Sequence, residues 1–211
     1  MTTLVAIQGD GFSVACVDSQ VSDMDDAGYA TQIATLRESS SKLANNGRYL
    51  LGAAGDVRAI NILHHAFNPP APPPTLKGKK LDQFITVKFI PALRECFESH
   101  GYATPDNDEK QHIAEHSSTI FVAINGMIYI IDGDYSWISE VNGVYAIGTG
   151  AQYALGALHV LMPKTKLSIA SAKKIALKAL SVAAKYDPYT GAPYHSFVQG
   201  NEKGNATQQK R

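Results

Sequence analysis

The feature that most constrains the fold is a β-hairpin signal at the start of the chain. Two short runs rich in β-branched or aromatic residues span residues 2–7 and 12–17. They flank the turn-forming sequence Gln8-Gly9-Asp10-Gly11. If Asp10-Gly11 forms the two-residue turn, counting back along the antiparallel ladder brings Thr3 opposite Asp18. The hairpin is therefore predicted to return a carboxylate to the beginning of the chain.

Two more hairpins are predicted from Asn-Gly pairs. Asn46-Gly47 lies between the runs 41–44 and 48–51, and Asn125-Gly126 lies between 119–124 and 127–131. The first of these hairpins places Lys42 on a strand, where a solvated lysine is the ordinary interpretation. Its second strand runs into Gly52-Ala53-Ala54-Gly55-Asp56, a small-residue turn before a predicted helix. Such a turn leaves backbone N–H groups free to receive an anion or an oxyanion.

Helical segments and a last strand complete the pattern. Helices are predicted at 57–67, 81–97, 153–161 and 168–186, and strands at 29–36, 137–147 and 194–198. Pro91 is predicted to kink the second helix, and Ser168 to begin the last. The order is strands, two helices, strands, two helices, strand. It predicts an α+β fold in which antiparallel sheets are covered by helices.

Length and charge restrict the class of protein. The 211 residues suit one domain, predicted at 1–199, followed by a polar tail, 200–211. Nineteen basic and nineteen acidic residues give no global field that would favour nucleic acid or an anionic membrane as partner. The longest nearly apolar stretch, 120–131, is too short to span a bilayer. Because Cys16 and Cys96 lie far apart in sequence, we expect free thiols and a cytoplasmic location.

The chain start also carries groups for nucleophilic chemistry. The small residue after Met1 allows removal of the initiator, which would leave a free α-amine and a hydroxyl on Thr2. These two groups are a nucleophile and its own base. The α-amine has a reference pKa of about 7.7–8.0, so part of it is neutral at pH 7. On these residues alone, a plain first strand is the alternative interpretation.

A zinc-protease pattern, H-x-x-E-H, occurs at 112–116. That motif needs a helix to bring both histidines to one face, together with a further ligand. A strand signal follows almost immediately and leaves no room for the helix. We therefore predict neither a bound metal nor a cofactor.

Several short motifs follow one another in a specific order. They are Thr2-Thr3-Leu4-Val5-Ala6, Val17-Asp18-Ser19-Gln20-Val21-Ser22, Ser41-Lys42-Leu43, Leu51-Gly52-Ala53-Ala54-Gly55-Asp56, Gly148-Thr149-Gly150 and Asp187-Pro188-Tyr189-Thr190-Gly191. The ordered set resembles proteasome β-type subunits and, most closely, the bacterial HslV peptidases, within the N-terminal-nucleophile hydrolases. The resemblance covers nearly the whole chain up to Val198. Each motif is weak alone, and their order makes the resemblance specific.

The resemblance implies a four-layer αββα sandwich and a threonine-type endopeptidase. It implies roles for Thr2, Asp18, Lys42, Gly52, Thr149, Asp187 and Thr190. Lys42, paired with Asp18 and kept charged, would lower the pKa of the Thr2 amine and hydroxyl. The Gly52 N–H would face the oxyanion of a tetrahedral intermediate. The remaining three residues would orient the Thr2 amine by hydrogen bonds.

The resemblance also implies partners: further copies of the chain in a homo-oligomeric ring, unfolded polypeptide as substrate, and an ATP-dependent unfoldase. Two alternatives stay open. One is a catalytically silent proteasome-like protein that serves as a structural or assembly component, for example of a virus particle, with a virion-associated location. In that case Asp18 and Lys42 would form a structural ion pair. The other is a different amidohydrolase of the same superfold. Removal of Met1 decides between an active and a silent chain.

Overall fold

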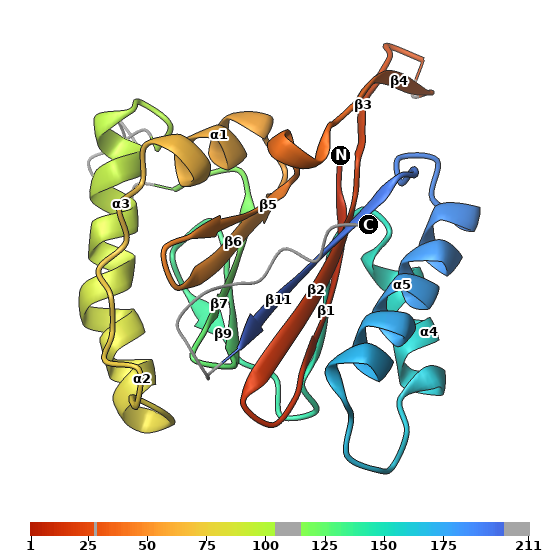
Figure 1. Ribbon diagram of the computed structural model, residues 1–211. Coiled ribbons are helices and arrows are strands. Elements are labelled where there is room, and N and C mark those ends of the chain that lie inside the picture. Colours follow the sequence, from red (N-terminus) through yellow and green to blue (C-terminus); the bar gives the residue numbers. More distant parts are fainter. Residues whose placement is uncertain (28, 104–114, 201–211) are drawn as a thin grey trace.

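The computed structural model describes residues 1–27, 29–103 and 115–200 (Figure 1). The strands are β1 (Thr3–Gln8), β2 (Phe12–Asp18), β3 (Gln20–Met24), β4 (Ala30–Thr35), β5 (Leu43–Asn46), β6 (Tyr49–Ala54), β7 (Thr119–Ile124), β8 (Met127–Ile131), β9 (Trp137–Ile138), β10 (Val144–Gly148) and β11 (Tyr194–Gly200). The helices are η1 (Glu38–Ser40), α1 (Val57–His65), α2 (Lys79–Phe84), the π-helical η2 (Ile85–Phe89), α3 (Ile90–Ser99), α4 (Ala151–Leu161) and α5 (Ile169–Tyr186). Their order agrees with the sequence prediction. The predicted tail lies almost wholly outside the described residues, so the domain boundary stays a prediction.

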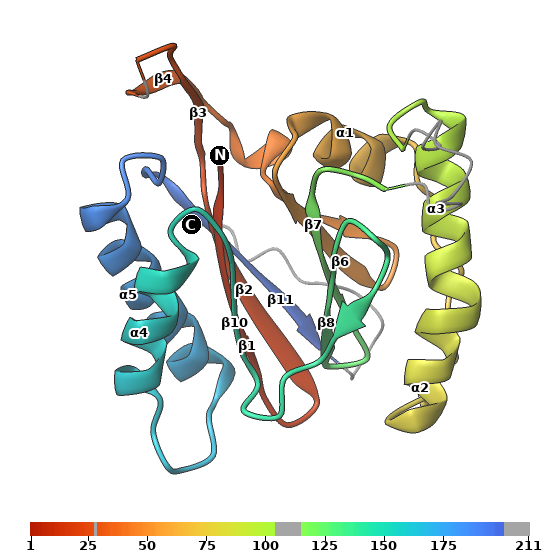
Figure 2. The ribbon, with the colours of Figure 1, turned by 180° about the vertical axis from the view of Figure 1, so that it is seen from behind.

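Two sheets face each other, and helices cover the outer face of each (Figures 1 and 2). One sheet has the strand order β10-β1-β2-β11 and the other β5-β6-β7-β8-β9, with antiparallel pairing in both. Helices α4 and α5 cover the first sheet, whereas α1, α2 and α3 cover the second. This arrangement is the predicted four-layer αββα sandwich, an α+β fold.

Apolar clusters fill the three interfaces between the layers. Along β1, Leu4 and Ala6 belong to the cluster between the sheets, whereas Val5 and Ile7 belong to the cluster under α4 and α5. This alternation follows from the two-residue period of a strand. Because both faces of the sheet are covered, β1 is a continuous apolar run and not an alternating one. The third cluster joins α1, α2 and α3 to the second sheet.

The first and third hairpins form as predicted. In the first, Leu4 pairs with Val17 and the register continues to Gln8 and Ser13, which is the register that places Thr3 opposite Asp18. In the third, Asn125 and Gly126 have φ angles of 52° and 77°. Positive φ at both turn positions is typical of the type I′ turn that suits the twist of a hairpin.

The second hairpin differs from the prediction by one residue. Strand β5 includes Asn46, and the turn is Gly47-Arg48. Asn46 stays in the strand because its side-chain amide donates to the carbonyls of Leu63 and Phe67, which fastens it to α1 and the residues after it. At its other end β5 begins at Leu43, so Lys42 comes just before the strand and does not lie on it, contrary to the prediction.

Pro91 changes the predicted second helix without ending it. Helix α2 passes into a π-helical turn, η2, and α3 begins at Ile90 with the proline in its first turn. A proline lacks an N–H and crowds the preceding turn, and a widened π-turn accommodates both effects. The expected buried face is present, with Leu81, Ile85, Phe89, Leu93 and Phe97 fully buried. Among the helices of the described residues, none is both long and apolar enough to cross a membrane.

Candidate active site

A buried ion pair lies where the two sheets meet the chain start. Lys42 Nζ is 2.7 Å from Asp18 Oδ1, and the two side chains are 1% and 0% exposed. Asp18 is the last residue of β2. Its carboxylate also accepts N–H groups from Thr3 at 2.9 Å, from Gln20 at 3.1 Å and from Gly191 at 3.3 Å. The carboxylate is therefore fully enclosed by donors, as a buried charge requires.

All three protons of the Lys42 ammonium are used. Nζ donates to Asp18 Oδ1 at 2.7 Å, to the Gln20 carbonyl at 2.6 Å and to the Met1 carbonyl at 2.8 Å. An ammonium group has three protons and cannot accept a hydrogen bond. While Met1 is present, Lys42 therefore has no N–H left for the Thr2 hydroxyl.

Burial shifts the pKa of both partners toward their neutral forms. Desolvation raises the pKa of the Asp18 carboxyl and lowers that of the Lys42 ammonium. The attraction between the two charges and the hydrogen bonds to Asp18 oppose these shifts. The Asp18 carboxylate thus favours the charged form of Lys42 against the cost of burial.

A second polar cluster surrounds Asp187, directly after α5. Asp187 Oδ2 accepts from Thr190 Oγ1 at 2.5 Å and from Thr149 Oγ1 at 2.7 Å. Thr149 also connects this cluster to the chain start, because its N–H donates to the Thr2 carbonyl at 2.9 Å. The structure thus gathers Asp187, Thr149 and Thr190 beside Thr2, which is itself only 2% exposed.

Comparison with known proteins shows which proteins this chain resembles. Residues 118–197 match a family model described as "Proteasome subunit". The ATP-dependent protease subunit HslV of Borrelia hermsii is 29% identical over 194 residues, which cover 90% of this chain and 93% of the relative. HslV of Borreliella burgdorferi strain ZS7 is 28% identical over 194 residues, covering 90% and 92%.

Solved structures agree on the fold. Thiobacillus denitrificans BPH has a TM-score of 0.69 at 20% identity and covers 96% of this chain and 100% of its own. The eukaryotic HslV from Trypanosoma brucei has a TM-score of 0.58 at 21% identity, with coverage of 94% and 99%. In sequence the chain is similar to proteasome subunits and to HslV, and it has the fold of these solved structures. The resemblance stated from the sequence motifs is confirmed, together with the N-terminal-nucleophile hydrolase fold.

Gly52 lies in β6, opposite Leu43 on one side and Phe121 on the other. A Cβ atom at this position would lie 2.7 Å from Leu43 Cδ2 and 2.8 Å from the Lys42 carbonyl oxygen. Real Cβ contacts essentially never come that close, so any larger residue would push the Lys42 backbone away. Glycine is therefore needed to place Lys42. The role of the Gly52 N–H at an oxyanion stays a prediction.

Sequence reasoning missed Thr3, Gln20 and Gly150 as parts of the candidate site. Thr3 donates its N–H to Asp18, and its hydroxyl lies 2.6 Å from Thr190 Oγ1. Gln20 supplies a carbonyl to Lys42, and the Gly150 N–H donates to Thr3 Oγ1 at 2.9 Å. The available signal was the predicted pairing of Thr3 with Asp18, which already placed Thr3 beside a carboxylate.

The predicted absence of a zinc site concerns a motif that lies partly outside the described residues, because His112 is not described. His116 is buried, and its ring contacts Phe97 and Tyr135 edge-on. Within residues 1–27, 29–103 and 115–200, no group of three or more potential metal ligands occurs.

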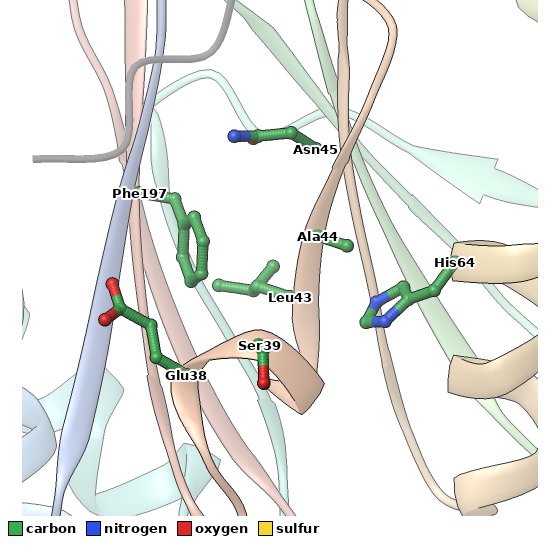
Figure 3. Close-up of a pocket in the computed structure, with 7 residues that line it drawn as sticks. All are labelled: Glu38, Ser39, Leu43, Ala44, Asn45, His64 and Phe197. Carbon is green, nitrogen blue, oxygen red and sulfur yellow. The ribbon is translucent and has the colours of Figure 1, made fainter.

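A cavity of about 260 Å³ opens between the edge strands β5 and β11 (Figure 3). Its lining consists of Glu38, Ser39, Leu43, Ala44, Asn45, His64 and Phe197. None of the predicted site residues lines it, so the cavity is separate from the Lys42 and Asp187 clusters. Burial, and then the neighbouring His65, lower the pKa of His64 to about 4.

The His64 pKa predicts how the stability of the protein depends on pH. The pKa of an unfolded histidine is about 6.5, so between about pH 6.5 and 4 the unfolded chain binds a proton that folded His64 does not. The free energy of unfolding is therefore expected to fall as the pH falls through this window. Urea unfolding of the parent and of His64→Gln between pH 4 and pH 7.5 measures the effect. The variant should lose less stability on acidification, and an unchanged pH dependence would contradict the assignment to His64.

Proposed function

We propose that this chain is a threonine-type endopeptidase that acts through Thr2 once Met1 has been removed. The observation that carries the proposal is the position of Lys42. Its buried ammonium is paired with Asp18, and Nζ lies 2.8 Å from the carbonyl oxygen of Met1. The carbon of that carbonyl group is bonded to the Thr2 nitrogen. The relatives' name, ATP-dependent protease subunit, supports the same reaction class.

Removal of Met1 would change two groups at once. The Thr2 amide nitrogen becomes an α-amine, and the Lys42 N–H that was bonded to the Met1 carbonyl becomes available to the Thr2 hydroxyl. A nearby positive charge lowers the pKa of both the amine and the hydroxyl of Thr2. The hydroxyl would then lose its proton to the α-amine as it attacks a peptide carbonyl. The Gly52 N–H would donate to the oxyanion of the tetrahedral intermediate. The peptide C–N bond would then break as the Thr2 ammonium returns its proton to the leaving amine, which leaves an ester on Thr2 Oγ1. Water, deprotonated by the same α-amine, would hydrolyse that ester, releasing the carboxylic acid and restoring the Thr2 hydroxyl.

The Asp187 cluster supports the amine in this scheme. Thr149 gives its single hydroxyl proton to Asp187, which leaves the lone pairs of Thr149 Oγ1 as acceptors. That oxygen is 3.5 Å from the Thr2 carbonyl oxygen and thus close to the Thr2 backbone. Asp187, Thr149 and Thr190 would orient the Thr2 amine through this oxygen.

The proposal extends to the partners of the chain. A homo-oligomeric ring would enclose the site and restrict it to unfolded polypeptide. The relatives are named ATP-dependent, so an ATP-dependent unfoldase is proposed to deliver the substrate. The proposed location is the cytoplasm, and the chemistry uses neither metal nor cofactor.

The first test is the state of the N-terminus. We expect the intact mass of native protein to lack Met1. Because Thr2 is only 2% exposed, removal should precede closure of the site during folding. Epoxomicin, the ligand of the related Thiobacillus denitrificans BPH structure, should add one inhibitor mass to the processed chain. Thr2→Ala is the matched control, because it keeps a small residue after Met1 but lacks the hydroxyl, and it should neither bind covalently nor hydrolyse peptide.

A native mass that retains Met1 in every molecule would overturn the proposal. In that form the Met1 carbonyl accepts the third N–H of Lys42, which is then not available to Thr2. The silent structural or assembly component would then be the better account of the chain, with Asp18 and Lys42 as a structural ion pair.

A further inference from the structure

We propose that Thr3, the residue after the nucleophile, is a positioning residue for peptide hydrolysis. The inference rests on the proposed function, in which Thr2 attacks and Asp187 holds its amine. Thr3 is fully buried, and hydrogen bonds to both polar clusters of the site meet at it. Its N–H donates to Asp18 Oδ1 at 2.9 Å, whereas its hydroxyl lies in the Asp187 cluster.

Counting protons gives the direction of each hydrogen bond around Asp187. Each threonine hydroxyl has one proton to donate. Thr190, at 2.5 Å, and Thr149, at 2.7 Å, direct theirs to Asp187 Oδ2, because bonds to an ionised acceptor are the strongest. Thr190 Oγ1 then accepts the Thr3 proton at 2.6 Å. The direct distance from Thr3 Oγ1 to Asp187 Oδ2 is 3.5 Å, too long for a strong bond.

The same Thr3 oxygen accepts the N–H of Gly150 at 2.9 Å, where α4 begins. The hydrogen bonds thus run in one direction, from the start of α4 through Thr3 and Thr190 to Asp187. A Cβ atom on Gly150 would overlap Thr3 Oγ1 and lie 3.0 Å from both Asp187 Oδ2 and Thr190 Oγ1. Helix α4 can therefore approach Thr3 this closely only with glycine at position 150.

Loss of the Thr3 hydroxyl would remove two hydrogen bonds, one from the Gly150 N–H and one to Thr190. The Gly150 N–H would lose its acceptor, and Thr190 would lose the donor that fixes its rotamer against Asp187. Asp187 would then hold Thr149, and through it the Thr2 amine, less firmly. Because the Thr3 hydroxyl is held between Gly150 and Thr190 and takes no part in the proposed bond changes, the change is expected in kcat and not in KM.

The experiment compares Thr3→Val with Thr3→Ser in the full, Met1-processed chain. Valine keeps the shape but removes the hydroxyl, and kcat is expected to fall ~10- to 100-fold at unchanged KM. Serine keeps the hydroxyl and should retain most of the parent kcat. Ser13→Ala is the matched control. Ser13 is also fully buried in this sheet, but its hydroxyl has no hydrogen-bond partner among the described residues, so its removal should leave kcat unchanged.

The outcomes separate this inference from the proposed function. An inactive processed parent would overturn both. An active parent with an equally active Thr3→Val variant would overturn only the role of Thr3. Equal losses in Thr3→Val and Thr3→Ser would also overturn it, because shape and not the hydroxyl would then matter. Thr3→Cys serves as a second variant without the hydroxyl, so the result does not depend on the folding of Thr3→Val.

Discussion

Replacing Lys42 with alanine is expected to abolish peptide hydrolysis by the processed chain, lowering kcat/KM by at least ~10³-fold. The substitution removes the cation that would lower the pKa of the Thr2 amine and hydroxyl. The protein should stay folded, because the Asp18 carboxylate keeps its hydrogen bonds from the N–H groups of Thr3, Gln20 and Gly191. Turnover of a fluorogenic peptide, with circular dichroism as the check on folding, measures the effect.

Lys166→Ala is the matched control for this substitution. Lys166 also pairs with an aspartate at 2.7 Å, but its side chain is 86% exposed and its partner, Asp10, lies in the turn between β1 and β2. The change in net charge is the same in both variants, so only the position differs. We expect parent activity from Lys166→Ala. Equal turnover by Lys42→Ala and the parent would show that Lys42 does not take part in the reaction.

The features that the sequence predicted well are those that depend on neighbouring residues. The register of the first hairpin follows from a two-residue turn and the period of a strand, and it placed Thr3 opposite Asp18 correctly. The Asn125-Gly126 turn needs positive φ angles that Asn and Gly adopt readily, and it too was predicted correctly. In both cases the information lies within the sequence of a single hairpin.

The features that the sequence did not reveal depend on contacts between distant segments. Asn46 stays in its strand because its side-chain amide donates to the carbonyls of Leu63 and Phe67, and the second turn is therefore one residue later than predicted. The hydroxyl of Thr3 meets the N–H of Gly150 across 147 positions in the chain. No local pattern records such a contact, because it exists only after the two sheets and α4 have packed.

The largest effect on stability is expected from Asp18→Ala. Lys42 would remain as a buried cation, 1% exposed, without its carboxylate, and the free energy of unfolding should fall by roughly 3–5 kcal/mol. Asp10→Ala is the control, because it breaks the Lys166 pair, whose side chains are 86% and 77% exposed. Exposed pairs contribute little to stability, so this control should unfold like the parent. Urea unfolding at pH 7 compares the three proteins.

The loss of unfolding free energy in Asp18→Ala should depend on pH if an unpaired Lys42 cation causes it. Burial already lowers the pKa of Lys42, and without Asp18 that pKa should fall further. Between the folded pKa and the unfolded value of about 10.4, the unfolded chain then binds a proton that the folded chain does not. The free energy of unfolding of the variant should therefore recover, relative to the parent, as the pH rises toward 10. A deficit that stays constant with pH, or one no larger than that of Asp10→Ala, would show that no buried cation had been left unpaired.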